Sequence, residues 1–190
     1  MKSAGCIRPR GGRKLLIAMG LFLALMLHAG TALGQKAGSA QQIAVMKTLK
    51  PGVVTVAVFS STIDEKGIES WTRAGMSLGV KVVVAKPKAM ADIAGLYRSV
   101  VKEKSAQMIL IPDASDELMT GVGFEYLRET VLADQVGILA PQEAMVSNGA
   151  LCFVTTENGK LKVFVNQRIA QVIGANVPSE PGASVTYVVR

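Results

Sequence analysis

The sequence predicts an α/β protein, a Rossmann-like layer sandwich with a mostly parallel sheet and a C-terminal antiparallel hairpin at one edge. Three observations predict this fold class. Strand-like and helix-like patterns alternate three times after residue 52, as in parallel sheets with right-handed crossovers. The first strand-like run, 53–59, is apolar almost throughout, which suits a strand covered on both faces. The dipeptide Asn158-Gly159 between two later β-type runs favours a hairpin turn.

The expected strands are short runs rich in apolar and β-branched residues, most of them bounded by Gly, Pro or polar residues. Pro51-Gly52 precedes the first, Pro112 ends the third, and Pro141 ends the fourth. In chain order the predicted strands are 53–59, 80–85, 108–111, 136–139, 151–156, 161–165 and 184–189.

The expected helices show apolar residues at helical spacing, with capping residues before them or glycines after them. Gly79 and Gly174 are suitable stops, and Ser115 or Asp116 is a suitable cap. In chain order the predicted helices are a short one within 35–50, one over 68–78, one over 90–104, one from the cap at 115 or 116 to 127, a helical turn at 142–146, and a short helix capped by Asn166.

The hairpin prediction depends on the residues around its turn. Leu161, Val163 and Val165 alternate with Lys160, Lys162 and Phe164, a period of two that is typical of a strand. The alternative is a loop at Asn158-Gly159, followed by a helix from Asn166 onward.

Residues 1–34 have the layout of a secretory signal peptide, in which a basic start precedes an apolar segment, Leu15 to Leu27, and then small residues up to Gly34. The 13 residues of the apolar segment are fewer than the roughly 20 of a membrane-spanning helix, so no permanent membrane anchor is expected. No cysteine lies at the junction, as a lipoprotein would require. We expect cleavage near Gly34 and a periplasmic protein.

Cleavage would leave 190 minus 34, or 156 residues, which suits one domain. We expect an N-terminal segment with a short helix over 35–50 and a single Rossmann-like domain over 51–190. Five of the 21 basic residues and none of the 14 acidic residues precede residue 35, so the mature net charge is 16 minus 14, or +2. No basic stripe interleaved with aromatic residues follows residue 35, and a nucleic-acid partner is therefore not expected.

The histidine and cysteine content excludes several kinds of site from the mature chain. The one histidine, His28, precedes the cleavage position, so a histidine triad or histidine metal site is excluded. Cys6 is removed with the same segment, and Cys152 alone cannot form an intrachain disulfide. Cys152 lies in an apolar run, 150–154, where a buried and unreactive thiol is expected.

Polar residues follow the strands that are predicted to be parallel. In open α/β sheets, ligands bind outside the carboxyl ends of such strands. A cluster of hydroxyl and carboxylate groups there would suit a small polar solute, whereas the alternative is that each residue forms a turn or caps a helix. The candidate ligand-binding residues are Ser60, Ser61, Asp64, Asp113, Ser115 and Gln142.

No cofactor, metal or catalytic site is predicted. No glycine-rich phosphate loop follows the first strand, since residues 59–65 contain no glycine, and no Walker-type lysine loop is present. Asp64-Glu65 and Asp116-Glu117 are adjacent pairs whose side chains point apart, and they are read as partners of the dipole in the first turn of a helix. We therefore expect a protein that is not an enzyme.

The segment 146–178 contains Asn148-Gly149-Ala150, the Glu157-Asn158-Gly159-Lys160 turn, Val163-Phe164-Val165-Asn166 and Ile169-Ala170. With these motifs it resembles the YfiR-like family of exported proteins. It implies a Rossmann-like periplasmic protein that represses a membrane-bound diguanylate cyclase by contact. Cys152 alone cannot form the disulfides of characterised members, and the end of the chain, 184–190, also departs from the family pattern.

A second resemblance, over 108–150, is to one lobe of an ABC-type periplasmic solute-binding protein, in which a strand, a Pro-Asp turn, a helix, a short strand and an Asn-Gly-Ala stretch recur. The leading hypothesis is a non-catalytic periplasmic regulator or sensor whose partner is a membrane signalling protein or a second copy of the chain in a homodimer. The alternative is a small-solute-binding protein. A hairpin at Asn158-Gly159 would favour the YfiR-like reading, and a helix beginning near Glu157 would favour the solute-binding lobe.

Overall fold

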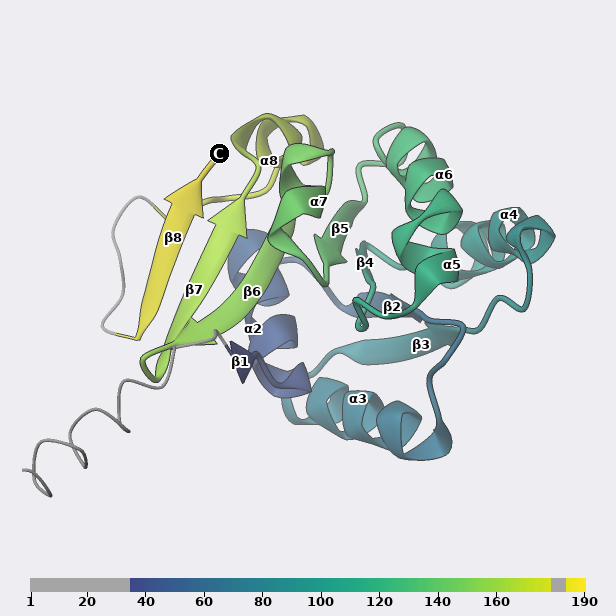
Figure 1. Cartoon of the computed structure of the whole chain (residues 1–190), viewed down its shortest axis with the longest axis horizontal. Coiled ribbons are helices and arrows are strands. Elements are labelled where there is room, and N and C mark those ends of the chain that lie inside the picture. The colour runs from purple at the N-terminus through teal and green to yellow at the C-terminus, as the bar shows by residue number, and fades with distance from the viewer. Residues whose placement is uncertain (1–34, 179–183) are drawn as a thin grey trace, which may run out of the picture. The chain divides into compact units, whose positions relative to one another are not determined.

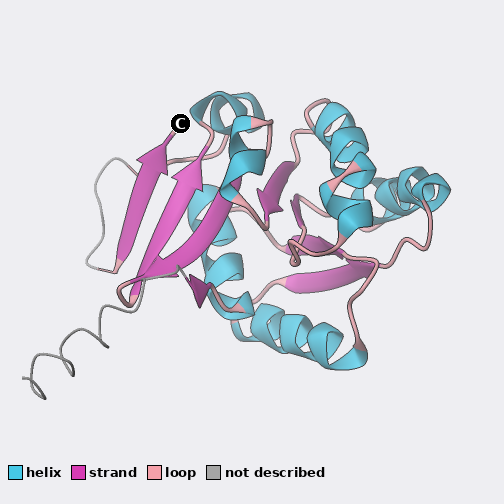
Figure 2. Ribbon diagram, in the orientation of Figure 1, coloured by secondary structure: helices cyan, strands magenta, loops and turns pink. Residues whose placement is uncertain are grey.

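A mixed sheet of eight strands organises the protein, and helices lie on both of its faces (Figures 1 and 2). The structure is a computed structural model that describes residues 35–178 and 184–190. The predicted signal peptide, residues 1–34, lies outside the described residues. The predicted fold class, a Rossmann-like layer sandwich with a mostly parallel sheet, is confirmed.

The elements follow the predicted order, with boundaries that differ by a few residues. The strands are β1 (Gln35–Lys36), β2 (Thr55–Phe59), β3 (Lys81–Ala85), β4 (Met108–Leu110), β5 (Gly137–Ala140), β6 (Cys152–Glu157), β7 (Lys160–Val165) and β8 (Val185–Val189). The helices are α2 (Ser39–Leu49), α3 (Glu65–Ser77), α4 (Met90–Arg98), the π-helical η1 (Ser99–Glu103), α5 (Glu117–Thr120), α6 (Val122–Val131), α7 (Glu143–Ser147) and α8 (Gln167–Ile173).

The sheet order is β3-β2-β4-β5-β6-β7-β8, and β1 pairs with β6. Every pair from β3 to β6 is parallel, β6 and β7 are antiparallel, and β8 returns parallel to β7. The hairpin therefore lies one strand inside the edge at which it was expected. The reason is that α8 carries the chain back, so that β8 runs beside β7 and forms the edge itself (Figure 1).

The β6–β7 hairpin forms as predicted. Asn158 and Gly159 both have positive φ angles, 52° and 74°, as a two-residue turn of type I′ requires. Six cross-strand pairs run from Cys152 opposite Val165 to Glu157 opposite Lys160. The turn is followed by a strand, so the alternative of a helix beginning near this point is excluded.

Two apolar clusters cover the two faces of the sheet. Along β2, Val56 and Val58 face one cluster, whereas Ala57 and Phe59 face the other, in the alternation of a strand that is buried on both sides. The first cluster includes residues of α2, α3 and α8, and the second includes residues of α4, α5, α6 and α7. Cys152 is fully buried in the first cluster, as predicted, and burial raises the pKa of its thiol.

The predicted helix after Asp116 is divided in two at Gly121. A Cβ atom at Gly121 would lie 2.9 Å from the carbonyl oxygen of Glu117, and one at Gly123 would lie 2.5 Å from that of Leu118. Glycine is needed at both positions because the backbone approaches so closely there. The apolar stripe continues through the break, and the sign of it in the sequence was the pair of glycines at 121 and 123, which the predicted helix did not take into account.

Candidate functional site

The carboxyl ends of β2, β4 and β5 lie at one edge of the sheet because these strands are parallel neighbours. The loops that follow them carry most of the predicted site residues. We call this edge, with the loops at residues 60–64, 112–116 and 141–142, the carboxyl edge. This is the place where open α/β sheets bind ligands.

Asp116 joins two of these loops. Its side chain is completely buried, and its carboxylate accepts hydrogen bonds from the Ser60 hydroxyl over 3.0 Å, the Ser61 amide over 2.7 Å and the Ser61 hydroxyl over 2.6 Å. The backbone N–H of Met119 donates to the same carboxylate over 3.2 Å, which makes Asp116 the cap of α5. The loop after β2 is thereby fixed to the loop after β4.

The prediction for Asp116 was incomplete. Asp116 does act in the first turn of a helix, as expected, but it was not counted among the site residues, although it positions Ser60 and Ser61. No local pattern reveals these bonds, because the partners lie 55 and 56 positions apart in the chain. The signal that could have found them is that Asp116 follows one predicted parallel strand and the two serines follow another.

Asp113 presents a carboxylate that is only partly engaged. The backbone N–H of Ser115 donates to Asp113 Oδ1 over 3.0 Å, and this bond holds the pKa of Asp113 below its ordinary value. The Ser115 side chain and the positive charge of Lys36 lower that pKa further. Asp113 is therefore negatively charged at neutral pH, and its second oxygen accepts no hydrogen bond from any described residue.

Gln142 extends the same group of loops towards β5. Its side-chain amide donates to the carbonyl oxygen of Ala114 over 3.3 Å, which connects the loop after β5 to the loop after β4. Asp64 behaves differently, because its exposed carboxylate accepts from the N–H of Gly67 and caps its own helix, α3. The structure thus connects five of the six predicted residues through the 112–116 loop and leaves Asp64 in a capping role.

The hairpin strand β6 extends past the carboxyl edge on one side. Ala140, the last residue of β5, lies opposite Phe153, whereas β6 continues to Glu157. The short strand β1 pairs with this extension at Thr155 and Thr156. The sequence did not predict β1, which brings Lys36 close enough to Asp113 to act on its pKa.

Four hollows of the described surface lie away from the carboxyl edge. Their volumes are about 440, 460, 280 and 540 Å³, and none is lined by a predicted site residue. They lie between α2 and α3, beside the hairpin turn, between α4 and α6, and around α8. None of these four hollows marks the carboxyl edge, which is identified by the chemistry and the hydrogen bonds of its polar residues.

Among residues 35–178 and 184–190, no group of three or more His, Cys, Asp or Glu side chains is arranged to hold a metal ion. In the same ranges, no helix combines the length and apolar character needed to cross a membrane.

Comparison with protein-family models and with curated proteins gave no match. Solved structures do match. The ABC domain of a Streptococcus pneumonia protein in complex with L-Trp superimposes with a TM-score of 0.64 at 19% identity, over 82% of this chain and 63% of that one. A ligand-free, open substrate binding protein with adhesive properties from Clostridium difficile has a TM-score of 0.63 at 15% identity, over 80% and 60%. A conserved domain protein from Vibrio cholerae has a TM-score of 0.60 at 14% identity, over 82% and 61%.

The chain spans about three fifths of the length of these structures. They correspond to the second resemblance found in the sequence, and none of them supports the YfiR-like one. The hairpin at Asn158-Gly159 is present all the same, so it does not separate the two families in the way expected. At identities of 14 to 19%, the likeness establishes a shared fold and nothing further.

Proposed function

We propose that the protein binds a small polar solute at the carboxyl edge. One observation carries the proposal: Asp116 fixes Ser60 and Ser61 beside a loop whose Asp113 keeps a charged oxygen without a partner among the described residues. A network held in this way needs little reorganisation when a ligand arrives. The fold shared with substrate-binding domains supports the same function.

The chemistry of the edge favours a solute that carries an ammonium group. The free oxygen of Asp113 is an acceptor for such a group, and a hydrogen bond between charged partners is stronger than one between neutral groups. The hydroxyl of Ser61 donates to Asp116 and retains lone pairs for a further donor. Because one similar structure holds L-Trp, amino acids are the first solutes to test.

Calorimetric titration with L-Trp, other amino acids and a neutral sugar tests the proposal. Asp113→Asn keeps the size of the side chain and removes its charge, so it should weaken amino-acid binding by about tenfold or more. Asp64→Asn is the matched control, because it makes the same change at an exposed capping aspartate and should leave affinity unchanged. Absence of binding across the panel, or equal affinities of wild type and Asp113→Asn, would contradict the proposal.

A second candidate function is regulation by contact with a membrane signalling protein, as in the YfiR-like reading. The hairpin does not by itself favour this reading, but its turn residues Asn158 and Gly159 are exposed, as a surface that contacts another protein requires. Crosslinking in envelope extracts followed by affinity capture tests it. A cyclase or sensor captured by wild type but not by a variant with a shortened turn would support this function, and capture by both would count against it.

We further propose that the protein is exported to the periplasm and acts by binding rather than by catalysis. Support comes from the signal-peptide layout of residues 1–34 and from a sequence whose one histidine, His28, lies in that segment. Cell fractionation, with N-terminal sequencing of the mature chain, tests export. Recovery in the cytoplasm with Met1 intact would contradict it.

A further inference from the structure

We propose that the groove between α4, η1 and α6 is a second binding site, one that takes small aromatic carboxylates. The groove has a volume of about 280 Å³. It lies away from the carboxyl edge, because η1 precedes β4 and the turn after α6 precedes β5, which places both near the amino ends of these strands.

The inner wall of the groove is a polar network in which Tyr97 is buried, Asp134 is half-buried and Lys102 is exposed. Tyr97 is only 3% exposed, and its hydroxyl donates to Asp134 Oδ2 over 2.7 Å. Lys102 binds the other oxygen of Asp134. The bond from Lys102, followed by that from Tyr97, lowers the pKa of Asp134, so the carboxylate is charged and both of its oxygens are engaged. This network holds the groove in shape and does not itself require a ligand.

The backbone at this point is unusual. Residues Ser99–Glu103 form a π-helical turn, in which the N–H of Lys104 donates to the carbonyl oxygen of Ser99 over 3.1 Å. Such wide turns are rare and are found frequently at functional sites. Here the turn carries Lys102 to Asp134 and leaves Arg98, one residue before it, at the mouth of the groove.

Two groups that line the groove remain without partners. The Arg98 side chain is exposed and makes no ion pair or hydrogen bond with any residue in the described ranges, and the Tyr126 hydroxyl makes no hydrogen bond with any of them. The ring of Tyr126 packs edge to face on that of Tyr97, with centroids 6.5 Å apart, and it remains half-buried. The groove is lined by two positively charged side chains, Arg98 and Lys102, and by one negatively charged side chain, Asp134, so the net charge of its lining is +1.

These features define the chemistry of the ligand. A guanidinium binds a carboxylate with two parallel hydrogen bonds, and an aromatic ring packs favourably on a tyrosine. A water molecule occupies about 30 Å³ in the liquid, so the 280 Å³ of the groove corresponds to the volume of roughly nine water molecules. Benzoate, which has about nine non-hydrogen atoms, is of a size that the groove can hold.

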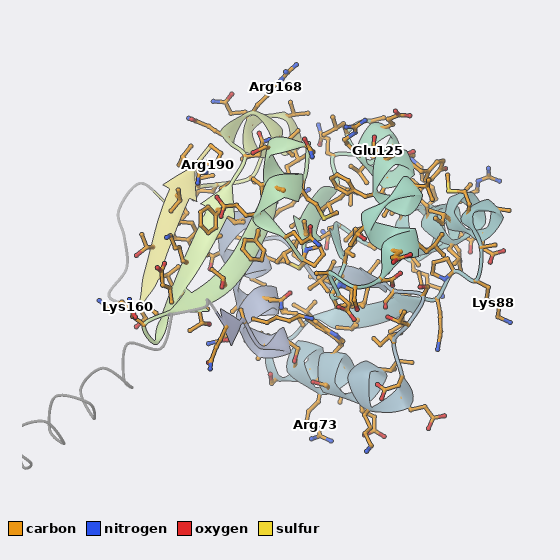
Figure 3. All side chains as sticks on the ribbon, viewed as in Figure 1. Arg73, Lys88, Glu125, Lys160, Arg168 and Arg190 are labelled. Atoms are coloured by element: carbon orange, nitrogen blue, oxygen red, sulfur yellow. The ribbon has the colours of Figure 1, made fainter. Side chains whose placement is uncertain are left out.

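NMR titration of the ¹⁵N-labelled protein with sodium benzoate tests the site. Shifts should concentrate in α4, η1 and α6. Cyclohexanecarboxylate and benzyl alcohol should each bind more weakly, since the first has no aromatic ring and the second has no charge. Arg98→Ala should weaken benzoate binding about tenfold or more. Arg73→Ala removes an exposed arginine from α3, which projects from a different part of the protein (Figure 3), and should have no effect.

Tyr126→Ala should weaken binding more than Tyr126→Phe, which keeps the ring. Neither Arg98 nor the Tyr126 hydroxyl takes part in the Tyr97–Asp134–Lys102 network, so Arg98→Ala and Tyr126→Phe should fold normally. Shifts centred on the carboxyl edge, no saturable shifts at all, or equal effects of Arg98→Ala and Arg73→Ala would overturn the proposal. Asp113→Asn should leave benzoate binding unchanged, so failure at one site is distinguishable from failure at the other.

Discussion

Replacing Asp116 with alanine should destabilise the protein more than replacing Asp64, although both aspartates cap helices. Asp64 accepts one hydrogen bond, from Gly67 N–H, and its loss should cost about 1 kcal/mol as for an ordinary cap. Asp116 is fully buried and accepts bonds from Ser60, Ser61 and Met119. Alanine there removes a cap and also leaves the buried Ser60 hydroxyl and the Ser61 groups without their acceptor.

The buried Ser60 hydroxyl left without a partner costs about 1 to 3 kcal/mol, which added to a cap of about 1 kcal/mol gives a total of about 2 to 4 kcal/mol for Asp116→Ala. The expected difference between the two variants is therefore about 1 to 3 kcal/mol. In a domain of this size, such a difference should separate the two midpoints of thermal unfolding by about 2 to 12 °C.

Urea unfolding followed by circular dichroism measures the free energy of unfolding of both variants. The comparison is valid when the slope of that free energy against urea concentration is the same in both. Asp116→Asn keeps one acceptor oxygen but directs an NH₂ group at a backbone N–H, and it should lose about 2 kcal/mol. On the Asp116→Ala background, Ser60→Ala and Ser61→Ala should cost little more, because the unpaired donors are then removed too. Equal losses for Asp116→Ala and Asp64→Ala would refute the bridging role.

Three further predictions concern the core, the backbone and the surface network. In a Cys6→Ser background, Cys152 should react with a thiol reagent only as fast as the protein unfolds, since the thiol is fully buried; rapid labelling of the native protein would contradict this. Gly75→Ala should cost several kcal/mol, because its Cβ would lie 2.5 Å from Val80 O. Gly159→Ala should cost about 1 kcal/mol, because only its positive φ of 74° opposes alanine. Chemical unfolding of both variants measures which of them is less stable. The pKa of Asp134 is lower in the folded state than its ordinary 3.8, so the stability it contributes is present above about pH 4 and is lost as the pH falls through the folded value. The free energy of unfolding of Asp134→Asn should therefore fall less steeply in acid than that of the wild type. Identical dependences on pH would exclude this contribution.

The sequence was most informative where a local pattern determines the structure. Asn158-Gly159 defined the hairpin because few other dipeptides accept two positive φ angles, and Asn166 and Gly174 marked both ends of α8. What it could not supply was the pairing of distant segments. β1 is two residues long and exists only because β6 extends past β5, and the parallel course of β8 depends on the crossover through α8.

The same distinction applies to the candidate site, where two aspartates three positions apart have opposite roles. In the sequence, both follow a strand; Asp116 is a suitable helix cap and Asp113 a candidate ligand-binding residue, but nothing local shows that Asp116 also binds Ser60 and Ser61. In the structure, Asp116 is fully buried and its carboxylate accepts four hydrogen bonds, so it has no capacity left for a solute and acts by positioning Ser60 and Ser61. Asp113 accepts a hydrogen bond from the backbone N–H of Ser115, and this bond favours its charged form. Solute recognition at the carboxyl edge should therefore depend on Asp113, and Asp116 should affect it only through the stability of the loops.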